Sequence, residues 1–287
     1  MRSAGISFAK SLACFSLLLT VITTQTALAE DETPRIISAD LGTTQVLQAL
    51  NLQDAIIAVD VTSVRQPELR GLPSIGYHRQ LSPEGLLSIK ADALVGAADM
   101  GPETAINALE KTGVQIIQQE PPKTIDTLIE NVRTLSTEFN HKEDGEKLIN
   151  IIEEMRTTLS NTSVKQKTAI FLLDMGGHGG ANGSMAGQGT GGDAFLNLLG
   201  LENMAKFPAY REASRESLIA LNPDVIVLAS GGRPSKGPKL EDSEVIALTR
   251  AAKEKNIMGM NASTLVAGLS VAAMDEAIRV KTTLAKK

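Results

Sequence analysis

Tyr77 is the residue of this chain best suited to bind a metal, because Arg79 lies two positions further on in the segment 76–85 and can stabilise its phenolate. A phenol with a pKa of about 10 is a poor ligand at neutral pH unless a cation stabilises the phenolate. An arginine supplies such a cation, and tyrosinate is one of the axial ligands that proteins offer to haem iron. The alternative is a turn tyrosine that packs beside a solvated arginine, and on this segment alone that role is favoured.

The first 29 residues have the pattern of a secretory signal. Arg2 and Lys10 precede an apolar stretch over 11–22, and Ala27-Leu28-Ala29 matches a small-residue cleavage site. The stretch is too short for a transmembrane helix, and no later segment approaches the ~18 uncharged apolar residues that a span needs. We therefore expect a signal peptide over 1–29, export to the periplasm and no stable membrane insertion.

Cleavage after Ala29 leaves 258 residues (287 − 29) without a cysteine, because Cys14 is the only one. A lipid-modified Cys14 is disfavoured, since Lys10 leaves almost no apolar core before it. An exported domain of this length buries enough apolar surface to fold without disulfides. Loss of two basic residues moves the formal charge from −5 to −7. An acidic chain with few aromatic residues and no basic stripe is a poor candidate for binding nucleic acid or a membrane surface.

Short apolar strands alternate with helices along most of the chain, which is typical of parallel sheets covered by helices on both faces. Strands are expected at 35–38, 56–60, 93–96, 114–117 and 168–173, and helices at 43–49, 83–89 and 103–112. From about 125 to 159 helical patterning runs almost without a break. We therefore expect an α/β protein with two similar lobes bridged by one long helix. The expected boundaries are 30–137 for the first lobe, 138–166 for the bridge and 167–287 for the second lobe.

An internal repeat supports duplicated lobes, because residues 82–95 match residues 214–227 at an offset of 132. Each copy starts with a serine, carries a glutamate two positions later (Glu84 and Glu216) and has an aspartate before an apolar run. Any capped helix that leads into a strand shares some of these features. Two copies, each in its own α/β unit, are better explained by duplication.

With these motifs, nearly the whole mature chain resembles the periplasmic substrate-binding proteins of haem ABC importers, in the class with two α/β lobes and one bridging helix. The resemblance is most specific at 76–88 and is clear at 186–193 and 221–226. It implies a ligand cleft between the lobes, ferric haem as the transported ligand, Tyr77 as the axial ligand and Arg79 as the support of its phenolate. His78 departs from the family pattern, in which an apolar residue such as Met or Leu is common.

The second lobe is expected to complete the pocket. The glycine-rich segment 175–192 lets backbone approach a flat ligand, and Met175 and Met185 offer adaptable contacts to a porphyrin face. The resemblance implies that His178 can reach iron on the same haem or on a second one, with an unligated loop histidine as the alternative. Arg233 follows a strand, where it could pair a propionate or stay solvated.

The resemblance also implies a partner. In the family that the chain resembles, carboxylates at the positions of Glu84 and Glu216 dock onto arginines of a permease dimer, which works with ATPase subunits. We therefore expect a monomer that delivers haem and does no chemistry on it. A first-turn glutamate is favoured by the helix dipole in any case, so capping is the alternative for both residues.

Two other classes of function have some support in the sequence. A ferric siderophore or a corrinoid could bind the same fold, although siderophore iron is already saturated whereas haem leaves an axial position for Tyr77. Residues 187–192 fit G-x-G-x-x-G and would suggest an exported nucleotide-dependent enzyme, but the preceding strand ends well before them. The chain has no HExxH, G-x-S-x-G or P-loop motif, so we expect a binding protein and not an enzyme.

Overall fold

The computed structural model describes residues 33–64, 66–174, 183–231 and 243–287. The fold reported below is that of Pro34–Lys287, which forms one compact unit. The expected signal peptide and three expected ligand contacts, Met175, His178 and Arg233, lie outside the described residues.

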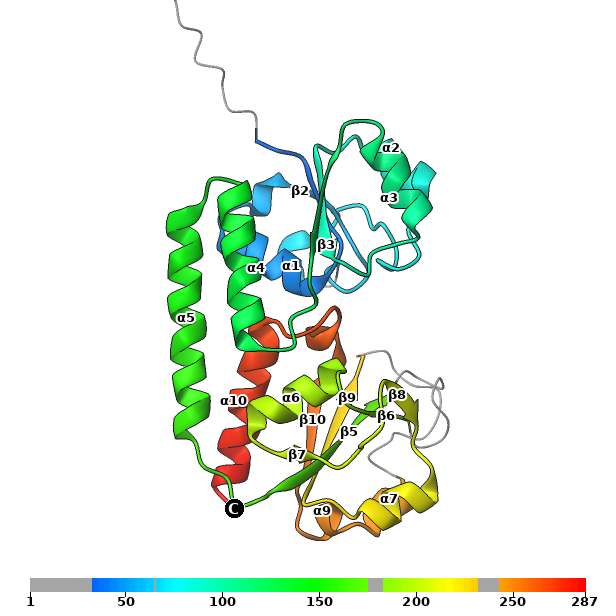
Figure 1. Cartoon of the computed structure of the whole chain (residues 1–287), viewed down its shortest axis with the longest axis vertical. Helices are drawn as coiled ribbons and strands as arrows, with labels where there is room; N and C mark the ends of the chain where they lie inside the picture. Colours follow the sequence, from blue (N-terminus) through cyan, green and yellow to red (C-terminus); the bar gives the residue numbers. More distant parts are fainter. Residues whose placement is uncertain (1–32, 65, 175–182, 232–242) are drawn as a thin grey trace, which may run out of the picture. The chain divides into compact units, whose positions relative to one another are not determined.

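The N-terminal lobe is built on a four-stranded parallel sheet in the order β2-β1-β3-β4 (Figure 1). Consecutive strand residues point to opposite faces, so Ile36 and Ile37 of β1 enter different hydrophobic clusters, and both are fully buried. Helices α1 and α4 cover one face, and α2 and α3 cover the other. The strands are β1 (Ile36–Ser38), β2 (Ile56–Val59), β3 (Ala93–Ala97) and β4 (Gln115–Gln119). The helices are α1 (Leu41–Ala49), α2 (Pro83–Ile89), α3 (Glu103–Glu110) and α4 (Ile125–Glu138), with short 3-10 turns at Gln53–Ala55 and Pro67–Leu69.

The C-terminal lobe has a mixed sheet in the order β10-β9-β5-β6-β8, and β7 also pairs with β5. Strands β5, β7, β9 and β10 are parallel, whereas β6 and β8 join through antiparallel pairs. Helices α6 and α10 pack on one face, and α7, α8 and α9 on the other. The strands are β5 (Thr168–Asp174), β6 (Ser184–Ala186), β7 (Glu202–Asn203), β8 (Tyr210–Glu212), β9 (Val225–Ser230) and β10 (Ile257–Asn261). The helices are α6 (Gly191–Leu199), α7 (Arg215–Leu221), α8 (Glu244–Ala247), α9 (Arg250–Lys253) and α10 (Val271–Ala285), with a 3-10 turn at Ala262–Leu265.

The long helix between the lobes is α5 (Lys142–Asn161), which lies beside both α4 and α10 (Figure 1). The helical stretch is not continuous, because α4 ends at Glu138 and Asn140 adopts a positive φ of 59° before α5 begins. Asparagine tolerates that left-handed conformation better than most residues. The expected α/β fold with two bridged lobes is confirmed, while the exact lobe boundaries stay a prediction.

The internal repeat is preserved in three dimensions. Ser82 and Ser214 each accept a hydrogen bond from the amide three residues on, which caps α2 and α7. Asp92 then accepts from the Arg35 amide at 2.8 Å, and Asp224 accepts from the Lys167 amide at 2.8 Å. These bonds fix the starts of β1 and β5, so each repeat performs the same structural task in its lobe.

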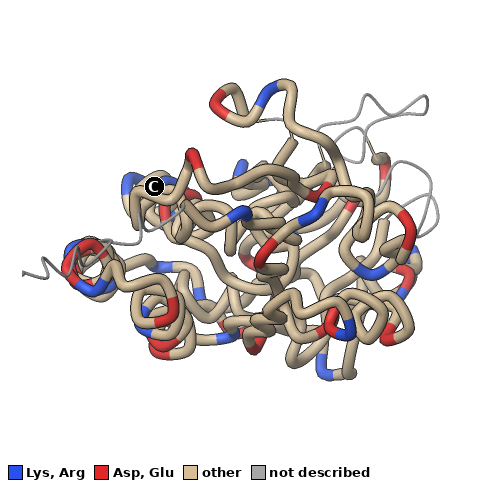
Figure 2. The backbone as a smooth tube through the Cα atoms, turned by 90° about the horizontal axis from the view of Figure 1, so that it is seen from above, with Lys and Arg blue, Asp and Glu red and all other residues tan. Residues whose placement is uncertain are grey.

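Acidic and basic residues are mixed along the described backbone (Figure 2). Within the described residues, none of the helices combines the length and apolar character required to cross a membrane.

Candidate functional site

Tyr77 lies in a turn beyond the carboxyl end of β2, where ligands of open α/β sheets bind. The preceding chain runs alongside β2, since the Ile75 amide donates to the Val59 carbonyl at 2.9 Å. The turn closes with a 2.8 Å bond from the Gln80 amide to the Tyr77 carbonyl. Gly101, which follows β3, accepts from the Leu81 amide at 2.8 Å and donates to the His78 carbonyl at 2.9 Å. The backbone that carries Tyr77 is therefore attached to two strand ends.

Tyr77 and Arg79 are both accessible, with the Tyr77 residue 39% exposed and the Arg79 side chain 53% exposed. The Arg79 Nη2 group donates to Asp99 Oδ2 in a close ion pair. Asp99 follows β3, so this pair links the tyrosine-bearing turn to the neighbouring strand end. The expectation that Arg79 supports the Tyr77 phenolate stays a prediction, because the contact recorded for its guanidinium is with Asp99.

His78 is fully buried between two aspartates. Its Nδ1 lies 3.9 Å from Asp60 Oδ2, and its Nε2 lies 3.6 Å from Asp99 Oδ1. Neither ring nitrogen has a hydrogen-bond partner, and Asp99 Oδ1 has none either. The His78 and Tyr77 ring centroids are 4.5 Å apart with their planes tilted by 59°, so the buried imidazole packs against the exposed phenol.

Sequence reasoning missed the aspartates that surround this turn, although a signal for them was present. Asp40, Asp60 and Asp99 each follow a buried strand, β1, β2 and β3 respectively. Carboxyl ends of adjacent parallel strands meet at one edge of a sheet. An aspartate after each of three consecutive predicted strands therefore indicates an acidic edge beside Tyr77.

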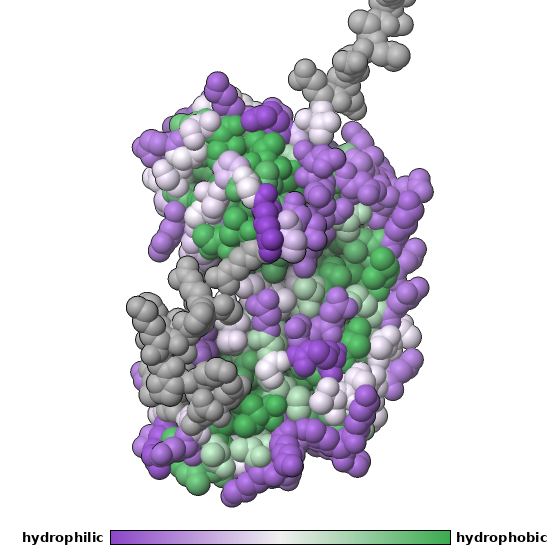
Figure 3. Space-filling model, turned by 180° about the vertical axis from the view of Figure 1, so that it is seen from behind, coloured by the Kyte–Doolittle hydropathy of each residue, from purple (hydrophilic) through white to green (hydrophobic). Residues whose placement is uncertain are grey.

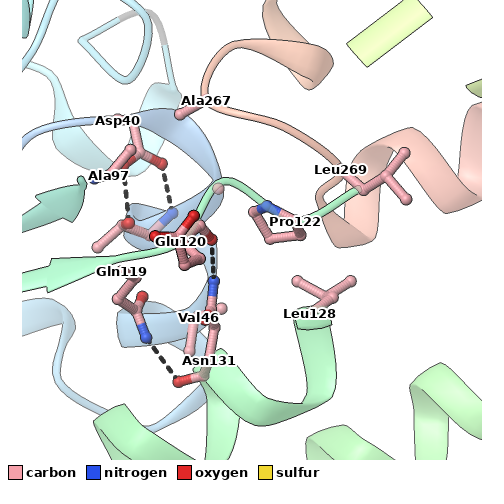
Figure 4. A pocket seen from close by; sticks show the side chains of 12 residues that line it. Asp40, Val46, Ala97, Gln119, Glu120, Pro122, Leu128, Asn131, Ala267 and Leu269 are labelled. Carbon is pink, nitrogen blue, oxygen red and sulfur yellow. Dashed lines mark hydrogen bonds between the residues drawn. The ribbon is translucent and has the colours of Figure 1, made fainter. Parts of the chain in front are cut away.

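A small hollow lies where the two lobes meet (Figure 4). It is bordered in the N-terminal lobe by Asp40 and Pro122 and in the C-terminal lobe by Ala267 and Leu269. The Leu269 amide donates to the Pro122 carbonyl at 2.7 Å. Gly268 permits this approach, since its φ is +104° and a Cβ there would lie 2.6 Å from the Pro122 nitrogen. Tyr77 does not line this hollow, which is a junction between lobes.

Two residues considered for the site, Met185 and Tyr210, lie in the C-terminal lobe. Met185 is 1% exposed and packs among the hydrophobic residues of its lobe, and its contact with a porphyrin face stays a prediction. The alternation of β6 turns this side chain inward. The second tyrosine of the chain, Tyr210, accepts a hydrogen bond from the Gly192 amide at 3.3 Å, and burial raises its pKa. Because that hydroxyl already serves the start of α6, Tyr77 is the better ligand candidate.

Glu84 and Glu216 are exposed in the first turns of α2 and α7. The Glu84 carboxylate accepts from the Ser82 hydroxyl at 3.1 Å. Its own backbone amide and this hydroxyl lower the pKa of Glu84. Both roles expected for the pair, docking and capping, are compatible with this placement.

Comparison with known proteins identifies the family. A model described as periplasmic binding protein matches residues 36–264, which include both sheets. The chain belongs to the periplasmic binding protein family. The matching family model and the solved structures below are described as binding proteins.

Two solved structures are similar to this periplasmic binding protein over most of their length. The periplasmic haem-binding protein HutB of Vibrio cholerae is 31% identical, with a TM-score of 0.77, 88% of this chain covered and 99% of that chain. A periplasmic haem-binding protein from Pseudomonas aeruginosa is 26% identical, with a TM-score of 0.77 and coverages of 88% and 93%. Among curated relatives, a vitamin B12-binding protein of Pectobacterium carotovorum is 24% identical over 204 residues, which cover 70% of this chain and 72% of the relative.

Proposed function

We propose that this protein captures ferric haem in the periplasm and delivers it to an inner-membrane ABC permease. Tyr77 carries the proposal, because it is an exposed phenol held at the carboxyl edge of a parallel sheet, where this fold binds ligands. The similarity to the Vibrio and Pseudomonas haem-binding proteins supports haem as the cargo.

Haem binding would rest on the hydrophobic effect and on one metal–ligand bond. Burial of the porphyrin between the lobes contributes affinity, and the Tyr77 phenolate supplies an oxygen ligand that favours ferric iron. Arg79 follows Tyr77 by two residues and carries a permanent positive charge. Its pairing with Asp99 holds the guanidinium at the strand edge, from which it would stabilise the phenolate or a propionate.

Titration with hemin tests this proposal, and the two tyrosines provide a matched comparison because each is 39% exposed. Tyr77→Phe keeps the ring and removes the ligand oxygen, so we expect loss of most of the affinity and of the tyrosinate charge-transfer band. Tyr210→Phe should retain both. Arg79→Ala should weaken binding by about 10–100-fold, the usual effect of removing a group that supports a metal ligand. A Tyr77→Phe protein with unchanged affinity and spectrum would remove Tyr77 as the ligand.

A corrinoid is the second candidate cargo, because several curated relatives are vitamin B12-binding proteins. Cobalamin would not need the phenolate of Tyr77. Parallel titrations with hemin and cyanocobalamin separate the two, since haem transport predicts tight, Tyr77-dependent binding of hemin only. Tight cobalamin binding that survives Tyr77→Phe, with weak hemin binding, would reverse the assignment.

The second lobe is proposed to supply His178 as a further iron ligand. Met175 would contact the porphyrin face, and Arg233 would pair with a propionate. His178→Ala should then change the number of haems bound or convert a six-coordinate spectrum to a five-coordinate one. An unchanged endpoint and spectrum would leave His178 without a role at the iron.

Export and docking complete the proposed function. Cleavage after Ala29 predicts that the protein recovered from the periplasm begins at Glu30, which N-terminal sequencing measures. Glu84 and Glu216 are proposed to dock onto the permease dimer from a monomeric binding protein. The Glu84→Ala/Glu216→Ala protein should keep its hemin affinity and lose stimulation of the importer ATPase, whereas pure capping residues would leave that stimulation intact.

A further inference from the structure

We propose that Leu87 and Ile219 are paired apolar anchors for a partner with two-fold symmetry, one anchor in each lobe. The inference rests on the proposed delivery of cargo to a permease dimer, and it extends that function to a contact surface outside the cargo site. Leu87 is 39% exposed on α2, and Ile219 is 47% exposed on α7. They occupy equivalent positions, because 87 and 219 differ by the repeat offset of 132.

The exposure of these two side chains follows the internal symmetry of the fold. Their preceding neighbours, Leu86 and Leu218, are 1% and 0% exposed and hold each helix against its sheet. Among the described residues, exposed large apolar side chains are few, and Leu87 and Ile219 are the two that stand at matching positions of the repeat. An isolated exposed leucine needs no explanation. An exposed aliphatic side chain at the same position of both copies of the repeat does need an explanation.

Each apolar side chain also lies next to a carboxylate. Glu84 precedes Leu87 by three residues, and Glu216 precedes Ile219 by three, a spacing that places the two side chains side by side on a helix. The helix dipole accounts for a glutamate in the first turn. It gives no benefit to an exposed Leu or Ile, and Ile is a weaker helix former than most residues. Helix stability therefore explains the carboxylates but not the anchors.

The symmetry identifies the kind of partner. Both helices lie on the sheet faces opposite α4, α5 and α10 (Figure 1), so a single partner can reach them without touching the bridging helix. Seen from behind, apolar surface is present on both the upper and the lower lobe (Figure 3). Two equivalent sites, each with one carboxylate and one aliphatic side chain, are complementary to two identical subunits that each present a cation beside an apolar recess.

Single cysteines test the contact directly, because the natural chain has no cysteine after Cys14. We would label Leu87→Cys, Ile219→Cys and Ile151→Cys with a maleimide photo-crosslinker and load each with hemin. Each would then be illuminated with the permease–ATPase complex of the source bacterium in nanodiscs. Ile151 is the matched control, since it is 50% exposed on α5 and has no apolar counterpart in the repeat. We expect the first two to crosslink to the same permease polypeptide and the control not to.

The same surface can be tested by affinity. Leu87→Ser/Ile219→Ser should reduce binding to the nanodisc complex by about tenfold or more, as truncation of interface anchors does, while Ile151→Ser should not. Hemin titration of each variant should match the parent protein. Crosslinks from one lobe only, from the control equally, or to a second copy of this chain would overturn the inference. Failure of the parent protein to bind hemin would instead reject the proposed cargo, so the two failures are distinguishable.

Discussion

Asp40 is a buried carboxyl group whose ionisation should be visible in the stability of the protein. It is 2% exposed at the end of β1. Its carboxylate accepts from the Thr43 amide at 2.7 Å, from the Thr43 hydroxyl at 2.8 Å and from the Ala97 amide at 3.1 Å. Burial nevertheless raises its pKa from the ordinary value of 3.8 to about 6, because these bonds only partly replace lost hydration and Asp60 adds repulsion.

The sign of the effect follows from the direction of this shift. A carboxyl group with a higher pKa in the folded state binds its proton more tightly there, so its contribution is fully present below pH 3.8 and is lost as pH rises through 6. Each pKa unit corresponds to about 1.4 kcal/mol, so ionised Asp40 should lower the free energy of unfolding by roughly 3 kcal/mol at neutral pH. About 2 kcal/mol of this loss should develop between about pH 4.5 and 7.5.

Urea unfolding of the parent protein and of Asp40→Asn at these two pH values measures the contribution. Asparagine cannot ionise but can still cap α1, although its amide group faces the Ala97 amide and adds a cost that is independent of pH. The diagnostic quantity is therefore the difference in pH dependence between the two proteins. Equal slopes, within about 0.5 kcal/mol, would refute the reasoning, since the parent is expected to lose about 2 kcal/mol more than the variant.

Glycines give two further predictions. Gly145→Ala would place a Cβ 2.4 Å from the Ser136 Cβ where α5 meets α4, so overpacking should lower the free energy of unfolding by about 1–3 kcal/mol despite better helix propensity. Gly85→Ala is the control, since its Cβ would lie 3.5 Å from Ser82, and thermal melts should show it equal to or more stable than the parent. Gly268→Ala combines a strained φ of +104° with a backbone clash at Pro122, so it should cost about 2–4 kcal/mol and disturb the lobe junction. A Gly268→Ala protein that unfolds at the same urea concentration as the parent would contradict the expected loss of stability. An unchanged small-angle scattering profile would contradict the expected disturbance of the lobe junction.

The parts of the fold that could be predicted from sequence are those specified by neighbouring residues. Serine caps, buried strand runs and the repeat at an offset of 132 all predicted elements that are present. Two features could not be predicted in this way. Strands β6 and β8 are three residues each and exist through pairing with each other and with β5. The end of α4 depends on Asn140, whose positive φ a helical pattern does not specify.

The residues of the candidate site also differ in how far the sequence could predict their surroundings. The ligand role of Tyr77 could be predicted through the family resemblance but not from its segment alone, because backbone bonds to Gly101 and Val59 hold the turn that displays it. The environment of Arg79 and His78 could not, since Asp99 lies 20 residues beyond Arg79 and approaches through the pairing of parallel strands. Aspartates at the ends of β1, β2 and β3 become neighbours only when the sheet order is known.

The pairing of Arg79 with Asp99 does not remove Arg79 from the proposed role at Tyr77. A guanidinium has five N–H donors in a fixed plane, and the contact with Asp99 uses Nη2, which leaves donors on its other edges. A carboxylate on one edge fixes the orientation of that plane, as second partners do for groups that assist a metal ligand. Asp99 Oδ1 also lies 3.6 Å from His78 Nε2, so the same carboxylate is close to the buried imidazole and paired with the Arg79 guanidinium. His78, which departs from the family pattern, therefore belongs to the ligand turn through its carbonyl, which accepts from the Gly101 amide at 2.9 Å, and places a titratable ring near Asp99 where a Met or Leu would be apolar.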